Sequence, residues 1–294
     1  MFIARLAPII FVLLWATGFI GAKLGLPYAE PFTFLSVRML ITLAILVPIL
    51  MFVGVLWPGW KPASHSMITG ILVHGVYLGG VFFAISRGMP AGVSALVVAL
   101  QPLLTAVVAR FMLGEQLRVI QIAGLFAGLV GVVLVLSPNL AGGIAVEGVN
   151  AITLVAVTLS VFGISIGTVY QKRYASGIDV RATTAWQYAG ALIPLGLMAF
   201  LFETREIEWT GQFVFAMAWL VLVLSIGAVG LLMFLIRNRS AASTASLFYL
   251  VPGVTAVIAH YLFGEDLQPI QLVGMAVVMA AVGLATSKPE RQAG

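Results

Sequence analysis

Residues 91–124 read AGVSALVVALQPLLTAVVARFMLGEQLRVIQIAG, and residues 241–274 read AASTASLFYLVPGVTAVIAHYLFGEDLQPIQLVG. The two stretches align without a gap at an offset of 150 residues, and 14 of their 34 positions are identical. The identities include the proline at 102 and 252 and the Gly-Glu pair at 114–115 and 264–265. Chance similarity between apolar helices would not extend across the loop that holds Gly-Glu, so the match indicates an internal duplication.

Long apolar runs surround both stretches. The chain has 294 residues, of which 62% are hydrophobic and 9% charged, far from the roughly 25% charged residues of soluble domains. A run of about 20 apolar residues crosses the ~30 Å of hydrocarbon in a bilayer. Ten runs of this kind are present: 4–21, 32–55, 67–86, 91–112, 117–136, 149–170, 183–202, 213–236, 241–263 and 267–286. The sequence therefore predicts an all-α membrane protein with ten transmembrane helices and no extramembrane domain.

The offset of 150 residues carries the fourth and fifth runs onto the ninth and tenth, so the repeat unit is five helices. An odd number of spans makes the two copies enter the membrane from opposite sides. We therefore predict two inverted five-helix repeats at 1–138 and 149–288, followed by a short cytoplasmic tail at 289–294. Inverted repeats are the architecture of alternating-access transporters, in which the substrate binds near the midplane at the repeat interface.

The basic residues predict the orientation. With the N-terminus in the cytoplasm, eleven of the fifteen Lys and Arg residues fall on the cytoplasmic side. They are Arg5, Lys61, Arg110, Arg118, Lys172, Arg173, Arg181, Arg237, Arg239, Lys288 and Arg291, whereas Lys23, Arg87 and Arg205 lie outside and Arg38 lies within the second helix. The positive-inside rule then places both termini in the cytoplasm. This distribution explains the net charge of +5 without a nucleic-acid partner.

Several motifs carry a resemblance to a known family. They are Trp15 with Gly18 and Lys23 in the first helix, Arg38 in the second, and Pro-x-x-Thr-Ala leading to Gly-Glu in the fourth and ninth. With these motifs the chain resembles the EamA-type members of the drug/metabolite transporter superfamily, and among them it looks most like YddG-type amino-acid exporters. The resemblance implies a monomeric basket of two inverted bundles in the bacterial inner membrane that exports small organic molecules.

Polar and aromatic side chains are unevenly distributed among the spans. The fifth and tenth helices carry only Gln121 and Gln271, near their starts, and therefore read as scaffold. The other helices supply the candidate substrate-binding residues Trp15, Arg38, His74, Tyr77, Gln101, Tyr170, Trp186 and Tyr249. Such groups at membrane depth describe an aromatic cavity suited to amphipathic solutes. The alternative for the Trp and Tyr residues is the aromatic belt at the membrane interfaces.

Three residues have two interpretations each. Arg38 lies about seven residues into the second helix, where it could meet a substrate carboxylate, or instead snorkel outward or brace a carbonyl group. Pro102 and Pro252 lie inside their helical runs, where proline removes a backbone hydrogen bond and bends the helix. Each of these prolines could be a hinge or a static kink.

The predicted function is alternating-access export of small amphipathic metabolites, with amino acids, including aromatic or apolar ones, as the leading substrates. Nucleosides or lipophilic drugs are the alternative cargo. No Asp or Glu lies in the middle of a span, so we expect either downhill efflux or coupling through His74. With no Cys and three scattered His residues, neither a catalytic dyad nor a metal site assembles, so an intramembrane enzyme is a weaker alternative and no cofactor is expected.

Overall fold

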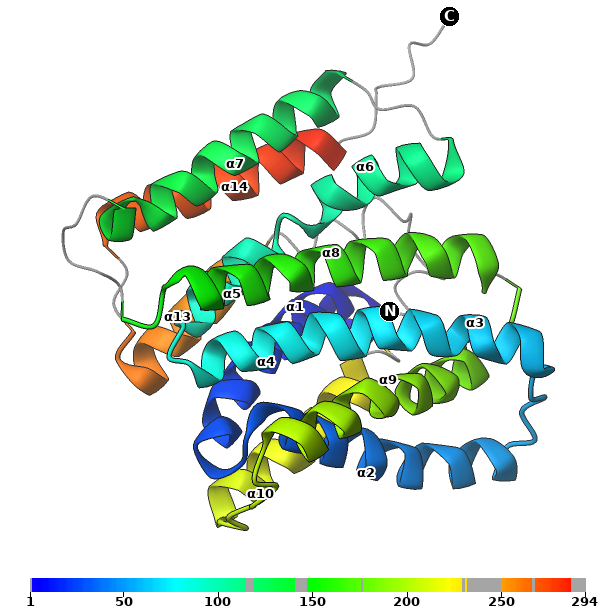
Figure 1. Ribbon diagram of the computed structural model, residues 1–294. Helices are drawn as coiled ribbons and strands as arrows, with labels where there is room; N and C mark the ends of the chain where they lie inside the picture. The colour runs from blue at the N-terminus through cyan, green and yellow to red at the C-terminus, as the bar shows by residue number, and fades with distance from the viewer. Residues whose placement is uncertain are drawn as a thin grey trace, which may run out of the picture.

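The computed structural model describes residues 2–114, 119–140, 147–175, 177–228, 231, 250–265 and 268–286. Within these ranges the chain is helical apart from short connections and one isolated bridge between Ala29 and Ile207 (Figure 1). The elements are α1 (Phe2–Gly25), η1 (Leu26–Tyr28), α2 (Pro31–Phe52), α3 (Trp60–Gly70), η2 (Ile71–Leu78), α4 (Gly79–Ser86), α5 (Ala91–Val98), α6 (Gln101–Leu113), α7 (Val119–Leu140), α8 (Ala151–Tyr174), α9 (Val180–Phe202), α10 (Gly211–Ala218), η3 (Trp219–Ala228), α13 (Val251–Phe263) and α14 (Pro269–Thr286).

Seven stretches of the described chain are helical, long and apolar enough to cross a membrane. They correspond to α1 with η1, α2, the continuous α3–η2–α4, α5 with α6, α8, α9, and α10 with η3. The remaining three predicted runs are represented by α7, α13 and α14. The chain is therefore an all-helical membrane protein in the part that the structure describes.

The helices pair across the two halves of the chain. Helix α2 packs against α9, α5 against α13, and α7 against α14. Two further contacts are equivalent in the repeat. Helix α1 contacts α13, and their counterparts in the other half, α8 and α6, contact each other. Figure 1 shows α7 and α14 side by side along one edge of the molecule, away from the central helices. This position agrees with the interpretation of these two helices as scaffold.

The glycine of each Gly-Glu pair ends a helix. Gly114 follows α6 with φ +71°, and Gly264 follows α13 with φ +65°. This left-handed conformation suits glycine, which has no Cβ to clash, and it commonly terminates helices. The duplicated sequence therefore produces the same helix end in both halves.

The third helix of each half departs from α-helical geometry. Residues Ile71–Leu78 of η2 and Trp219–Ala228 of η3 are π-helical, and the two segments lie about one repeat apart in sequence. A π-helical segment widens the helix and is frequent at functional sites. His74 and Tyr77 lie in η2, and Ser225 lies in η3.

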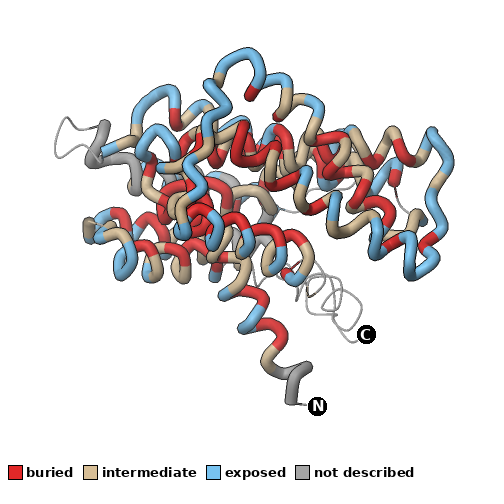
Figure 2. Tube along the Cα trace, turned by 90° about the horizontal axis from the view of Figure 1, so that it is seen from below, coloured by how far each residue is buried: buried red, intermediate tan, exposed pale blue. Residues whose placement is uncertain are grey.

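Buried residues recur along the inward sides of the helices, whereas exposed residues gather on outer faces and connections (Figure 2). An aromatic cluster joins α2, α4 and α10 in this interior. The ring of Phe34 lies 5.5 Å from Phe82 and 5.2 Å from Phe213, centroid to centroid. All three side chains are buried, so they fix these helices together at the end where η1 and α10 begin.

Candidate functional site

A narrow cavity lies where helices of the two halves meet. It offers about 30 Å³ to water-sized occupants, enough for one or two water molecules. Its lining residues are Trp15, Phe19, Tyr77, Ala95, Val98, Ala99, Gln101, Pro102, Ile164, Val251 and Pro252. The structure thus brings together five of the predicted site residues from α1, η2, α6 and α13. The side chains around the cavity must move apart before a metabolite fits.

The backbone is interrupted beside this cavity. The fourth predicted helix divides into α5 and α6 at Ala99 and Leu100, and Pro102 lies in the first turn of α6. Pro252 has the same place in the first turn of α13. Proline is tolerated in a first turn because its missing N–H has no intrahelical acceptor there. The two prolines therefore begin helices beside the cavity.

A buried polar cluster surrounds Arg38. Its guanidinium donates to the hydroxyl of Ser225 from Nε at 3.3 Å and from the second terminal nitrogen at 3.1 Å. The hydroxyl of Tyr188 donates to the carbonyl of Ser225 at 3.3 Å, which adds α9 to the cluster. The ion pairs that the structure describes, Lys23–Glu265 and Asp179–Arg181, leave Arg38 out. Arg38 thus contributes a positive charge that is buried among neutral groups.

His74 and Tyr77 connect this cluster to the cavity. The imidazole of His74 lies against the ring of Tyr188, with 4.7 Å between ring centroids. Tyr77 is buried, interacts electrostatically with Arg38, and also lines the cavity. Arg38 and His74 are therefore grouped around Tyr188 and Ser225, and of the predicted residues Arg38, His74 and Tyr77 it is Tyr77 that lines the cavity.

Two predicted residues lie elsewhere. The ring of Trp186 lies 6.4 Å from Trp57 and 6.3 Å from Trp60, near the turn between α2 and α3. Tyr170 lies near the end of α8, where its hydroxyl and the Nδ1 atom of His65 are 2.8 Å apart. Neither residue lines the cavity. Tyr249 lies outside the described residues.

Two loops are fastened together at the left-hand end of Figure 1. The carboxylate of Glu203 accepts hydrogen bonds from the backbone of Phe32 at 2.8 Å and from the backbone and hydroxyl of Thr33 at 2.6 and 2.7 Å. In return, the carboxylate of Glu30 accepts from the backbone and hydroxyl of Thr204 at 2.6 and 2.7 Å. We call this arrangement the clamp. It joins the start of α2 to the end of α9.

The backbone reinforces the clamp. Ala29 and Ile207 form an antiparallel bridge, and the N–H of Glu208 donates to the carbonyl of Tyr28 at 2.9 Å. The hydroxyl of Tyr28 also donates to the Oε1 atom of Gln212 at 3.0 Å, at the start of α10. Backbone and side chains therefore connect the loops of the two halves.

A second fastening, the latch, lies at the same end. Lys23, near the end of α1, forms an ion pair with Glu265, which follows α13. The Glu265 carboxylate also accepts from the backbone N–H groups of Ala91 at 3.1 Å and Gly92 at 3.4 Å. A carboxylate at a helix start stabilises the exposed N–H groups and the helix dipole. The latch therefore ties α1, α5 and α13 together across the halves.

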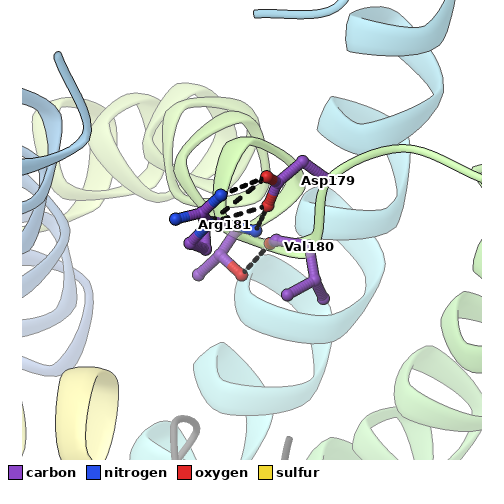
Figure 3. Close-up of polar contacts among 4 residues, drawn as sticks. Asp179, Val180 and Arg181 are labelled. Carbon is purple, nitrogen blue, oxygen red and sulfur yellow. Dashed lines mark hydrogen bonds and ion pairs between the residues drawn. The ribbon is translucent and has the colours of Figure 1, made fainter. Parts of the chain in front are cut away.

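The opposite end has a hollow in the place that corresponds to the clamp. It measures about 550 Å³ and is lined by residues 54–58 and by Gly177, Ile178, Asp179 and Arg181. Asp179 corresponds to Glu30 at an offset of 149 residues. Its carboxylate accepts from the backbone and the guanidinium of Arg181 on its own helix, as Figure 3 shows. Asp179 thus caps α9, whereas Glu30 reaches across to another helix.

Sequence reasoning did not assign Ser225 to the site. Ser225 lies in the apolar segment WLVLVLSIGA, where its single hydroxyl at membrane depth is the one feature of the sequence that indicates a polar site. Its partnership with Arg38 joins residues 187 positions apart, which no local pattern reveals. The clamp was missed for the same reason, since its acidic residues all lie in loops.

The profile of the EamA-like transporter family matches this chain twice, over residues 3–137 and 151–287. The uncharacterized transporter YvbV of Bacillus subtilis (strain 168) is 27% identical over 96% of this chain and 90% of its own length. A probable amino-acid metabolite efflux pump of Salmonella typhimurium (strain LT2) is 26% identical over 93% of this chain and 91% of its own.

Two further comparisons concern substrate names and fold. A probable terminal-alkyne amino-acid exporter of Streptantibioticus cattleyicolor is 32% identical over 67% of this chain and 64% of its own length. One solved structure, whose title says only that it is the crystal structure of a protein, superimposes with a TM-score of 0.66. It covers 95% of both chains at 22% sequence identity, so it supports the fold alone.

Proposed function

Because this chain belongs to the EamA-like transporter family, whose profile matches both of its halves, we propose that it exports amino acids and related amphipathic metabolites. The protein is a multi-pass membrane transporter, and an inner-membrane location agrees with the name of a relative, the inner membrane transporter YedA of Escherichia coli. The names of the Salmonella and Streptantibioticus relatives favour amino-acid cargo.

The observation that carries this proposal is a buried positive charge next to a cavity between the two halves. An amino acid presents a carboxylate and a side chain of variable polarity. The Arg38 cluster offers charge-assisted hydrogen bonds to the carboxylate, while Trp15, Tyr77 and Gln101 offer aromatic and amide contacts. Trp186 and Tyr170 would contact the substrate only as it passes the opposite end. Pro102 and Pro252 are the proposed hinges.

The proposed mechanism is alternating access by a monomer of ten spans in two inverted repeats. With both termini in the cytoplasm, the end that holds the clamp and the latch faces outward. The small cavity volume then describes a state closed around the site, because 30 Å³ does not hold an amino acid. The substrate would enter from the cytoplasm, and the latch would open to release it outside.

The charge of Arg38 gives the direct test. Purified protein in proteoliposomes is assayed for counterflow of leucine and of leucinamide, which lacks the carboxylate. We expect Arg38→Gln to reduce leucine counterflow by roughly 10- to 100-fold, since a hydrogen bond to a charged group contributes about 1.5–3 kcal/mol. Leucinamide counterflow should change far less.

Two variants control this experiment. Arg87→Gln removes an exposed arginine whose guanidinium lies over the ring of Phe83, away from the cavity, and should leave both fluxes unchanged. Arg38→Lys keeps the charge and should retain part of the leucine flux. Equal losses of leucine and leucinamide in a folded Arg38→Gln protein would overturn the carboxylate role.

The driving force for transport is tested with a different variant. Downhill efflux is the simpler proposal, and coupling through His74 is the alternative, because this half-buried imidazole lies within a span and can change charge near neutral pH. His74→Leu in the same liposomes, with and without a pH gradient, separates them. An unchanged response to the gradient excludes His74 as the coupling group. The same counterflow assay with nucleosides and lipophilic amines tests the alternative cargo.

A further inference from the structure

The cavity is built from corresponding positions of the two halves. Pro102 and Pro252 correspond at an offset of 150, as do Gln101 and Val251, and all four line the cavity. In the first helix of each half the offset is 149, which pairs Trp15 with Ile164. Both of these residues line the cavity as well.

A pair of hydrogen bonds supports the offset of 149. The hydroxyl of Ser165 on α8 donates to the carbonyl of Gln101 on α6 at 3.2 Å. Across the molecule, the hydroxyl of Thr255 on α13 donates to the carbonyl of Ala16 on α1 at 3.4 Å. Ala16 and Ser165 correspond at 149 residues, and each contacts the equivalent helix of the other half. The two sides of the cavity are therefore formed by corresponding helix pairs, α8 with α6 and α1 with α13, although the two hydrogen bonds themselves are not counterparts.

Two of the corresponding pairs that line the cavity differ in side-chain polarity between the halves. The first half contributes an indole at Trp15 and an amide at Gln101, where the second half contributes aliphatic Ile164 and Val251. A pair that does not line the cavity shows the same difference, because charged Arg38 corresponds to neutral Gln187 at an offset of 149. In each of these pairs, the member from the first half carries the more polar group.

We infer that the substrate binds in one orientation, with its charged end toward the first half and its apolar side chain against Ile164 and Val251. This inference rests on the proposed function and identifies these two residues as determinants of substrate size. Both aliphatic side chains line the cavity, so each takes up space that a larger substrate side chain would need. Small and branched apolar amino acids would fit better than aromatic ones in the wild-type protein.

The test is competition between substrates in Ile164→Ala and Val251→Ala. Counterflow of leucine is measured with phenylalanine or alanine as competitor in proteoliposomes. We expect each variant to raise the preference for phenylalanine over alanine by about tenfold, the effect of a methylene or more in an apolar pocket. Discrimination between leucine and leucinamide should stay at the wild-type value, because the Arg38 side of the site is intact.

Matched controls lie on the same two helices. Ile152→Ala on α8 and Val257→Ala on α13 remove identical side chains that are exposed on the outer faces of the molecule. They should leave the preference unchanged. Wild-type preference in folded, active Ile164→Ala and Val251→Ala proteins would overturn the inference. Failure of the proposed function would differ, because the wild-type protein would then show no amino-acid counterflow at all.

Discussion

The clamp and the latch fasten the same end of the molecule, yet only the latch has a full set of counterparts in the repeat. Lys23 and Lys172 correspond, as do Glu265 and Glu115, and Ala91 corresponds to Ala241. In the clamp, Glu203 falls on Gly54 at the offset of 149 that pairs Glu30 with Asp179, so the opposite end lacks its second carboxylate. Because its residues have counterparts at both ends of the molecule, the latch can form at one end and then at the other during transport. The clamp can form only at the end where both of its carboxylates are present.

The latch and the clamp therefore have different roles at that end. We expect the latch to open and close during transport while the clamp holds α2 and α9 together throughout. The hollow between residues 54–58 and 177–181 agrees with this view, because the opposite end has no equivalent of the clamp there. Glu115 and Ala241 lie outside the described residues, so their part in this comparison rests on sequence.

Breaking the latch should have the largest effect. Glu265→Gln leaves Lys23 without its opposite charge and weakens the cap on α5. If the state that is closed at the latch loses about 1–3 kcal/mol of stability, its population relative to the open state falls by roughly 5- to 150-fold. We expect faster labelling of an Ala99→Cys site by an impermeant maleimide added outside, and slower export.

The control for this prediction is Glu206→Gln, an exposed acid at the same end. Labelling rates that are the same in Glu265→Gln and Glu206→Gln proteins would contradict the role of the latch. Because the natural chain contains no cysteine, any labelling reports the introduced site alone.

Glu115→Gln should change the labelling rates by a comparable factor, but at the opposite face of the membrane. If Glu115 and Lys172 form the corresponding latch at the cytoplasmic end, their separation favours the cavity open to that side. Labelling of Ala99→Cys should then accelerate in inside-out vesicles and slow in right-side-out vesicles. Acceleration from the outside instead would show that the two Gly-Glu pairs are not functional counterparts.

Glu203→Gln should affect stability more than direction. Its carboxylate accepts three hydrogen bonds in the clamp, and their weakening should lower the free energy of unfolding by about 1–3 kcal/mol. The expected readout is a lower thermal midpoint in detergent, with the ratio of outside to inside labelling unchanged. A changed ratio would mean that the clamp also takes part in gating.

The smallest effect is expected from locking the clamp covalently. Residues paired in an antiparallel bridge have Cα atoms about 4.5–5.5 Å apart, within the range of a disulfide. Oxidised Ala29→Cys/Ile207→Cys protein should therefore transport within about twofold of the reduced form, since a fixed clamp passes no motion to the site. Loss of flux on oxidation, restored by a reductant, would place the clamp among the moving parts.

The fold was predictable where one side chain or a short pattern controls the local backbone. Gly114 and Gly264 end their helices in both copies of the duplicated stretch, whereas the expectation that Pro102 and Pro252 lie inside helices was wrong, because each lies in the first turn of a helix. Trp15, Tyr77 and Gln101 were selected because polar and aromatic groups at membrane depth favour a cavity. These inferences required only helix length, sequence offset and side-chain polarity.

The rest depends on contacts between distant segments. The bond from Arg38 to Ser225 and the bonds of the clamp join residues more than 160 positions apart, and no periodicity encodes them. Trp186 and Tyr170 share the chemistry of cavity residues, but their positions near helix ends place them with Trp57, Trp60 and His65 instead. For Trp186 the face of the helix decides its partners, because Tyr188, two residues further along α9, belongs to the Arg38 cluster.

Access to the cavity tests the central claim most directly. Ala99 lines it and can be replaced by cysteine in a chain that has none. Labelling Ala99→Cys with an impermeant maleimide in right-side-out and inside-out vesicles, with and without leucine, measures exposure from each face. We expect labelling from both faces and protection by leucine, because alternating access exposes the cavity to each side in turn. Labelling from one face only, indifferent to leucine, would contradict it.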